Sequence, residues 1–388
     1  MPETSDHGGT RSGASPISAR APVTLRELTA GLVWPQLLRS AGLAVQPPRL
    51  LVGLLVVLGL LAVGWLLDVV WGAAPPAELP IRFRAAPGEE PFADAFLAEV
   101  FSGVDVAARR AMELDVSKAL TALVQSAYGT AWSLLGAAPV RGAVTLAAFL
   151  IVCAIGGGAI ARMTAVDVGA DLSMSARDGV AFALRRWRSL TAAWLAPLFV
   201  VGAIAMLLRA SGWLLLSLPV LDVLGAVLYA IPLALGLLAM LLLGVFAVGH
   251  GLLIPAVAVE GTDALDAVQR AYAYVLGRPG RMLLYAAVLL AQGCVAYLVV
   301  AWIVDAGVRF THENTTAWLS EARAAKVHGD DAAAPTLIGF WESAFRLLPP
   351  AFLVSYAFSA STVLYLLLRR VNDEQDVRDI WMPGDDAA

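Results

Sequence analysis

The residue types that most often carry out chemistry in proteins are sparse in this chain and lie far apart. It has four histidines: His7, His250, His312 and His328. No two of them are four residues apart, the spacing that places two metal ligands on one face of a helix. The two cysteines, Cys153 and Cys294, lie inside apolar runs, so we interpret them as small membrane-buried residues and not as a disulfide or metal-binding pair.

Other chemical motifs are also missing. The three glycines at Gly156–Gly158 have no strand before them, as a phosphate-binding loop would, and their place in an apolar segment favours close helix packing. The central thirds of the apolar spans contain no ionisable residue, which would mark a transport or catalytic path. We therefore assign no catalytic, cofactor-binding or metal-binding residue and no cofactor, and we expect that the protein is not an enzyme.

Composition indicates the class of protein. Of the 388 residues, 59% are hydrophobic and only 15% are charged, and the mean hydropathy is +0.74. A soluble domain has about 25% charged residues, so a soluble fold could not cover its surface with this composition. The net charge of −4 comes without a polybasic tail, which excludes a nucleic-acid partner. We expect an all-α, polytopic membrane helix bundle.

Six apolar runs reach the roughly 20 residues that a transmembrane helix needs. We expect the six spans at 49–71, 142–161, 190–208, 225–249, 282–304 and 347–368. The segments that connect or flank them are 1–48, 72–141, 162–189, 209–224, 250–281, 305–346 and 369–388. The apolar stretch at 212–225 is too short to cross alone, so we interpret 209–224 as a turn at the outer surface.

Positive charge sets the expected orientation. With the N-terminus inside, the cytoplasmic segments contain 16 of the 27 Lys and Arg residues. Several arginines lie directly at span ends, where the positive-inside rule is strongest: Arg162, Arg185, Arg186, Arg188, Arg369 and Arg370. We predict an inner-membrane, multi-pass protein with cytoplasmic N- and C-termini.

The N-terminal segment and the outer segments are expected to be partly helical. Thr24 and Glu27 have capping-box spacing, and a helix from there, interrupted by Pro35 and closed by Pro47, would lie on the bilayer surface. The segment 72–141 has apolar residues on one side and mixed charge on the other, which predicts amphipathic helices. These helices either pack against the bundle or form a cap that binds a partner.

Two cytoplasmic segments have the same construction. In 162–189 and 250–281, a helix-capping residue is followed three positions later by an acid: Ser175 with Asp178, and Asp263 with Asp266. Each then continues with apolar residues at helical spacing and ends in arginine before the next span. The unit of span, short helix and span is either a true internal repeat or a chance similarity.

The second of these helices has a predicted buried face and a predicted exposed face. The residues expected to bury are Leu265, Val268, Tyr272 and Val275, and those expected to be exposed are Gln269, Arg270 and Tyr274. Gly277 and Pro279 predict the end of the helix. A protein partner would therefore bind through the exposed residues, whereas a simple connector would need none.

The stretch Pro255, Glu260-Gly261, Ala264, Arg270 and Gly277 resembles bacterial integral membrane proteins of the glycerophosphodiesterase membrane-domain type and related uncharacterised families. The resemblance covers about residues 142–305. It implies a span that ends after proline, a small-residue amphipathic helix and another span. No phosphodiesterase domain is attached, so that activity is not implied.

Three functions are consistent with these features. The first is a scaffold or accessory subunit without a catalytic site, in contact with membrane lipid and with a protein partner at the cytoplasmic helices or the outer loop. The alternative is a permease-like transport component that couples to a partner through a cytoplasmic amphipathic helix. A membrane enzyme would need clustered acids, bases or metal ligands, which the sequence does not group.

Overall fold

The computed structural model describes residues 34–72, 92–216, 225–320 and 333–382. Within these ranges the chain forms helices and no strand, and six of the helices are long and apolar enough to cross a membrane. The predicted all-α membrane bundle is therefore confirmed at the level of fold class.

The candidate spans are α3 (Pro47–Val70), α7 (Pro139–Ala170), α9 (Trp187–Leu216), α11 (Ala230–Glu260), α13 (Pro279–Thr316), and α15 (Ala333–Phe345) continuing into α16 (Leu348–Asp373). The shorter elements are η1 (Trp34–Leu38), α2 (Arg39–Ala44), α4 (Phe92–Met112), α5 (Val116–Val124), η2 (Gln125–Gly129), α6 (Thr130–Ala137), α8 (Ala176–Arg185) and α12 (Ala264–Gly277).

The helices are longer than the predicted spans because charge ends an apolar run without ending a helix. The run predicted to end at 161 continues as α7 to Ala170, through Arg162 and Asp167. Proline marks several starts, since its missing N–H is not needed in the first turn: α3, α7, α13 and α16 each have proline at the first or second position. Half of the predicted outer turn, residues 217–224, lies outside the described ranges, and the other half, residues 209–216, is helical and belongs to α9.

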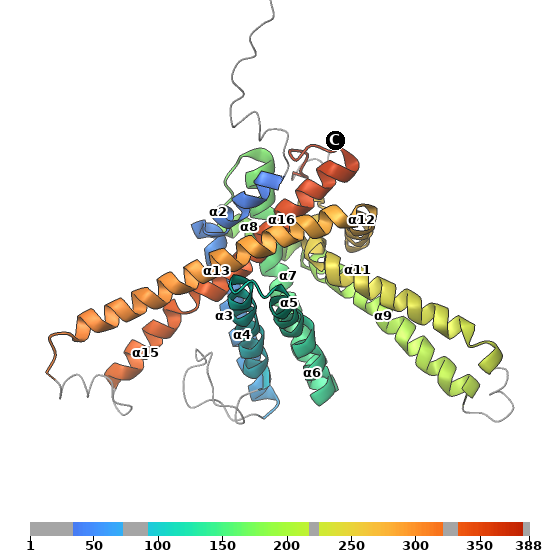
Figure 1. Ribbon diagram of the computed structural model, residues 1–388, viewed down its shortest axis with the longest axis horizontal. Coiled ribbons are helices and arrows are strands. Elements are labelled where there is room, and N and C mark those ends of the chain that lie inside the picture. The colour runs from blue at the N-terminus through green and yellow to red at the C-terminus, as the bar shows by residue number, and fades with distance from the viewer. Residues whose placement is uncertain (1–33, 73–91, 217–224, 321–332, 383–388) are drawn as a thin grey trace, which may run out of the picture.

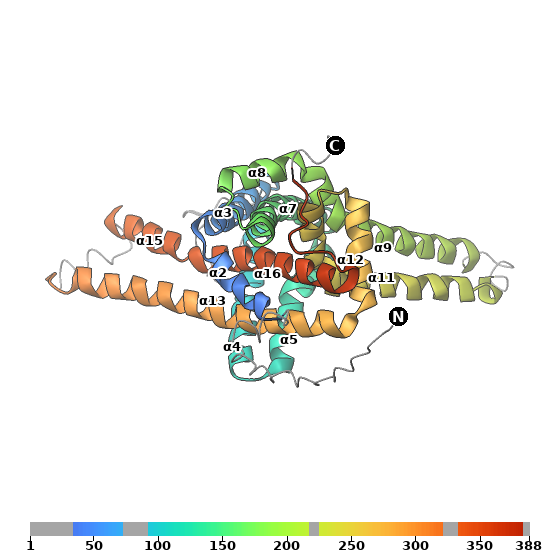
Figure 2. The ribbon, with the colours of Figure 1, turned by 90° about the horizontal axis from the view of Figure 1, so that it is seen from above.

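The helices spread from a common end (Figure 1). At this end, which we call the hub end, α2, α8, α12 and the C-terminal end of α16 gather. From there α9 and α11 diverge together in one direction and α13 with α15 in the other, as Figure 2 shows from above. We call the paired α9 and α11 helices the wing, and the end opposite the hub the far end.

The wing is apolar on its outside. Phe199, Leu237 and Met240 are 76%, 73% and 64% exposed. Near the far end, α9 and α11 enclose a cavity of about 580 Å³ lined mainly by apolar residues and glycines, among them Leu208, Gly212, Gly236, Leu237 and Met240.

Helix α16 forms the centre of the core. Its polar residues Ser355, Ser359 and Thr362, which are spaced along one side, are fully buried. Ser355 Oγ donates to the carbonyl of Ala44 (2.8 Å), and Thr362 Oγ1 donates to the carbonyl of Phe358 (2.7 Å). Ser359 Oγ accepts from Thr164 Oγ1 of α7 (3.3 Å). The stripe therefore serves helix packing, because each hydroxyl has a hydrogen-bond partner in or next to α16.

The glycine run in α7 packs as the sequence indicates. A Cβ added to Gly156, Gly157 or Gly158 would lie 1.9 Å from Val56, 2.3 Å from Phe358 and 2.4 Å from Leu190, respectively. Three neighbouring helices thus approach α7 at one level, and only glycine leaves the room for them.

The N-terminal segment packs into the bundle where it is described. Residues 24–33 of the expected surface helix lie outside the described ranges. The part that follows, η1 and α2, buries Leu37, Leu43 and Ala44 against α13 and α16. Pro47 begins α3 instead of only closing the preceding helix, because proline fits the first turn.

Candidate functional site at the hub

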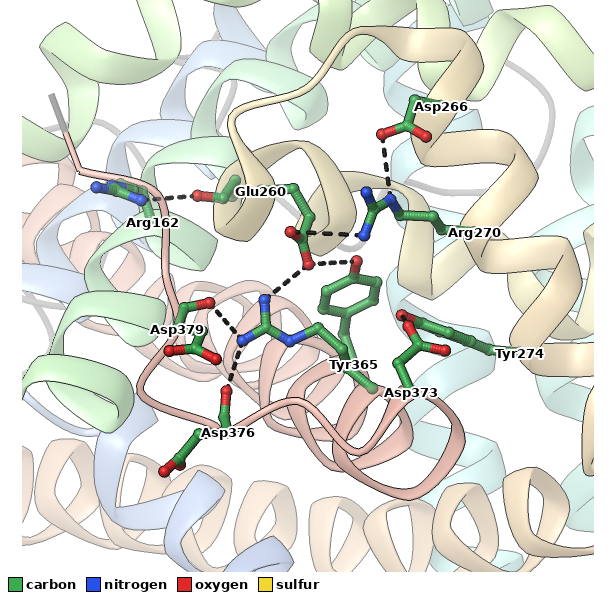
Figure 3. Close-up of polar contacts among 11 residues, drawn as sticks. Arg162, Glu260, Asp266, Arg270, Tyr274, Tyr365, Asp373, Asp376 and Asp379 are labelled. Carbon is green, nitrogen blue, oxygen red and sulfur yellow. Dashed lines mark hydrogen bonds and ion pairs between the residues drawn. The ribbon is translucent and has the colours of Figure 1, made fainter. Parts of the chain in front are cut away.

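The hub contains a cluster of polar side chains from four helices (Figure 3). We define the hub cluster as Arg162, Glu260, Arg270, Tyr365 and Arg369. Arg162 comes from α7, Glu260 is the last residue of α11, Arg270 lies on α12, and the other two lie one turn apart on α16. The residues span more than 200 positions in sequence, so only the tertiary fold brings them together.

Glu260 is the centre of the cluster. Its Oε1 accepts hydrogen bonds from Tyr365 Oη (3.0 Å) and Arg369 Nη1 (2.8 Å), and its Oε2 lies 3.6 Å from Arg270 Nη1. The side chain is only 14% exposed. A carboxylate with so little water needs these donors, because an unpaired buried charge is strongly unfavourable.

Arg369 connects Glu260 to the segment that follows α16, residues 374–382, which we call the tail. Its side chain is 1% exposed, and its Nη2 donates to the carbonyls of Asp376 (2.8 Å) and Asp379. Glu374 turns the chain with a φ of 57°, in the left-handed region, so that the tail folds back over the helix end. One guanidinium therefore joins α11, α16 and the tail.

Arg162 holds the other end of the tail. It is 1% exposed, and it donates from Nη1 to the carbonyl of Ala258 (3.0 Å) and from Nη2 to that of Trp381 (2.7 Å). Its guanidinium lies 5.1 Å from the ring centroid of Phe182 and 5.5 Å from that of Trp381. Both distances are within cation–π range.

Trp381 is the main contact of the tail. Its backbone N–H donates to the carbonyl of Val259 (2.9 Å), and Arg186 stacks over its ring at 4.8 Å while donating to the carbonyl of Gly261. Gly261 has a φ of +64°, and a Cβ there would lie 2.5 Å from the indole. The end of α11 therefore needs glycine both for its backbone conformation and for the approach of Trp381.

A third buried arginine, outside the hub cluster, fastens the N-terminal helices to α7. Arg49, which is 2% exposed, donates from Nη2 to Asp167 Oδ2 (2.8 Å) and to the carbonyl of Met163 (3.1 Å). Its Nη1 donates to the carbonyl of Leu43 (3.1 Å). Like Arg369, this side chain bonds to backbone carbonyls as well as to an acid.

The chemistry of the hub cluster is that of a clamp. The buried guanidiniums donate to backbone carbonyls of other segments. Arg162 donates to Ala258, in the last turn of α11, where carbonyls lack partners inside their own helix, and Arg369 donates to the tail. The phenol of Tyr274 donates to Asp373; burial and the nearby negative charge of Asp373 raise the pKa of Tyr274, so the phenol stays protonated. Burial lowers the pKa of Arg270, but Glu260 and Asp266 more than offset this, so its pKa is raised and it stays charged. Such groups hold helices in place.

The caps predicted for α8 and α12 are present. Ser175 Oγ accepts from the backbone N–H of Asp178 (3.2 Å), and Asp263 Oδ1 accepts from that of Asp266 (3.0 Å). The helix α12 ends at Gly277, before Pro279, as the sequence indicates. The same construction therefore positions both short helices at the hub end.

The predicted faces of α12 are partly wrong. Val275 is buried as predicted, but Leu265 is 64% exposed, and Tyr274, predicted to be exposed, is 3% exposed. Arg270 is half-buried against Glu260. The buried stripe contains Ala267 and Ala271, because small residues let α12 approach its neighbours closely, and this turns Leu265 away from the core.

The histidines and cysteines lie apart where they are described. His250 Nδ1 is 3.0 Å from Tyr128 Oη, and His312 Nδ1 is 3.1 Å from Glu342 Oε1. Cys153 and Cys294 are free thiols, each half-buried. His7 and His328 lie outside the described ranges. Among the described residues, no three His, Cys, Asp or Glu side chains group as metal ligands would.

Sequence reasoning did not identify the hub cluster. It placed Arg162 and Arg369 at span ends facing the cytoplasm, whereas they are buried between helices. One signal was available: Glu260 directly follows nine residues without charge, so the helix end carries an acid into the core. No family model, curated protein or solved structure matches this chain.

Proposed function

We propose that the protein is a multi-pass inner-membrane scaffold or accessory subunit, not an enzyme, with both termini in the cytoplasm. The observation that carries this proposal is the use of the buried charges at the hub. Arg49, Arg162 and Arg369 each donate to backbone carbonyls of neighbouring segments. A catalytic group must reach a substrate, whereas these groups hold helix ends together.

A partner would bind at the hub end, on the exposed sides of α8 and α12. On α12 the exposed residues Leu265, Gln269 and Leu276 follow one another at helical spacing, and the two leucines are 64% and 59% exposed. On α8, Leu184 is 54% exposed beside the exposed Arg185. Apolar residues with a basic neighbour suit a protein surface or the anionic lipid head groups next to it.

The test is the composition of the complex purified from the native membrane in mild detergent. We expect a partner in a fixed ratio to this chain, lost when Leu265→Ser and Leu276→Ser are combined. The matched control is Leu237→Ser combined with Leu241→Ser, on equally exposed leucines of the wing, which should leave the partner bound. A chain that purifies without a partner in fixed ratio would contradict the scaffold proposal.

A transport component is the second candidate, and the position of α12 favours it. This helix directly joins two candidate spans, α11 and α13, so force on α12 would reach both. ATP-driven uptake by membrane vesicles that contain this chain and a co-purified ATPase, abolished by the same Leu265 and Leu276 changes, would support transport over a passive scaffold. The resemblance of residues 142–305 to glycerophosphodiesterase membrane domains stays a prediction.

A further inference from the structure

The helices between α3 and α7 form a hairpin, residues 92–137, with α4 as one arm and α5, η2 and α6 as the other. The hairpin is fixed at the far end. The carboxylate of Asp68, near the far end of α3, accepts from the backbone N–H of Ala93 (3.0 Å) and pairs with Arg141 of α7 (2.6 Å). Figure 1 shows the arms running from there beside α3 and α7 towards the hub end.

The tip of the hairpin reaches the middle of the bundle. Helix α4 packs against α13, and Asp105 and Arg109 of α4 lie near Tyr297, which is the nineteenth of the 38 residues of α13. On the other arm, Tyr128 Oη donates to the carbonyl of Ala247 (3.1 Å) and lies 3.0 Å from Nδ1 of His250, the twenty-first of the 31 residues of α11. This arm of the hairpin thus meets α11 nearer to its hub end than to its far end.

This tip is charged and open to its surroundings. It contains three ion pairs, each formed within the hairpin: Asp105 with Arg109 (2.8 Å), Arg110 with Glu113 (2.9 Å), and Asp115 with Lys118 (2.7 Å). The side chains of Arg109 and Lys118 are 66% and 68% exposed. Since each positive group has its negative partner inside the hairpin, the tip offers no net charge for an external partner to complement.

Helix α5 has two different faces, and none of its residues is buried. Val116, Leu120 and Val124 follow at intervals of four residues on one face, and Leu120 is 55% exposed. Lys118 and Thr121, which are also exposed, lie away from this row around the helix. A helix with this pattern lies at a boundary between an apolar and an aqueous phase.

Charged side chains at the depth of a span face protein or water and not lipid, because each costs about 2.5–3.5 kcal/mol in the bilayer centre. The tip is exposed, so protein does not cover it. We propose that an aqueous inlet, open at the far side, reaches the tip of the hairpin at the depth of the middle of α13. Helix α5 forms its wall, with the Lys118 face towards water and the Leu120 face towards lipid.

The turn that follows α5 indicates that the region reached by the inlet is functional. Residues Gln125–Gly129 form a π-helical turn, an irregularity that is often found at functional sites. Tyr128, in this turn, meets His250, whose carbonyl accepts from Trp194 Nε1 (3.0 Å). The inlet would bring water and small hydrophilic solutes to the Tyr128–His250 pair. This inference does not depend on the scaffold proposal.

The test compares two cysteines that are two residues apart. In a background with Cys153→Ala and Cys294→Ala, Lys118→Cys and Leu120→Cys are treated in sealed vesicles of both orientations with a charged, membrane-impermeant thiol reagent. We expect Lys118→Cys to react at least tenfold faster than Leu120→Cys, and only from the side where Gly72→Cys, at the far end of α3, also reacts. Leu237→Cys, exposed on the wing, should stay unlabelled.

Every other result would overturn the proposal. Equally fast reaction at both positions would place the hairpin in bulk water, and no reaction at either would mean that lipid or a second copy covers it. Thr121→Cys against Val124→Cys repeats the comparison with residues outside the ion pairs. The depth is checked separately: a short bifunctional thiol reagent should join Tyr128→Cys to Ala247→Cys, and failure of this cross-link would show that the hairpin does not reach α11.

Discussion

At the hub, side chains of four helices and the tail fill the space between helix ends, whereas along the wing the side chains of two helices point mostly outward. The hub uses buried charge: Glu260 and Arg369 meet at 2.8 Å with almost no contact with solvent. The wing has Leu237 and Met240 exposed and a cavity between its helices. Buried charge therefore fixes the packing of the hub, whereas the wing leaves apolar side chains exposed on its outside.

From the comparison of hub and wing, we expect the largest loss of stability from a change at Glu260. Glu260→Gln leaves Arg369 buried without a negative partner, which should lower the free energy of unfolding by roughly 3–5 kcal/mol. The measurement is thermal or denaturant unfolding in detergent micelles. The matched control is Asp266→Asn, which removes a half-exposed partner of Arg270 and should cost about 0–1 kcal/mol. Equal effects of the two changes would mean that the hub charge is solvated.

A second prediction concerns the tail. Trp381→Ala removes two cation–π contacts, with Arg162 and Arg186, each worth about 0.5–2 kcal/mol, and should release residues 374–382. Limited proteolysis should then cut the tail faster than in the unchanged protein. Arg378→Ala, at an exposed position of the same segment, is the control and should leave the cleavage rate unchanged. Unchanged cleavage in both variants would contradict a docked tail.

Glycine-to-alanine changes should lower the free energy of unfolding at the hub and raise it in the wing. In Gly261→Ala the new methyl group would clash with Trp381, and alanine would have to adopt a positive φ. This change should destabilise the protein by about 1–3 kcal/mol. Gly244→Ala, in α11 of the wing with no atom within 4 Å of the new Cβ, should stabilise by about 0.5–1 kcal/mol, since alanine favours the helix. The unfolding temperatures of the two variants test this prediction. A shift in the same direction for both would mean that the hub and the wing do not differ in how tightly their glycines are packed.

The smallest effect is expected from Tyr274→Phe. At neutral pH it removes one hydrogen bond, worth about 0.5–1.5 kcal/mol. The pKa of Tyr274 is raised above its ordinary value of 10.0 by burial and by Asp373. The stability from the protonated phenol is therefore complete below about pH 10 and is lost as the pH rises through the folded-state pKa. Unfolding measured between pH 8 and pH 11 should depend less on pH in the variant, and an unchanged dependence would exclude Tyr274 as its source.

The sequence predicts the parts of the fold that depend on local pattern. Apolar length identified six candidate spans, and cap spacing identified the starts of α8 and α12 at Ser175 and Asp263. Small residues predicted close packing at Gly156–Gly158. A span and a cap each depend on residues within a few turns. The glycine run is visible in the local sequence, although the residues that it contacts lie on three other helices.

The hub cluster was not predictable in this way, because its contacts depend on residues far apart in the chain. Glu260 and Arg369 are 109 residues apart, and an arginine at a span end has the same local sequence whether it faces water or a carboxylate. For α12, hydrophobicity selected Leu265 over Tyr274 for burial. The structure reverses this choice, because Asp373 provides an acceptor for the phenol and lipid or a partner can cover the leucine.

The distance in sequence between Arg162 and Trp381 has a consequence for biosynthesis. The two residues are 219 positions apart, and Trp381 follows all six candidate spans. At ribosomal rates of about 5–20 residues per second, α7 would enter the membrane on the order of 10 to 40 s before Trp381 is made. During that interval the guanidinium of Arg162 needs water or an insertion factor as a temporary partner. The hub therefore closes last, and a nascent chain stalled before the tail would stay open at its hub end.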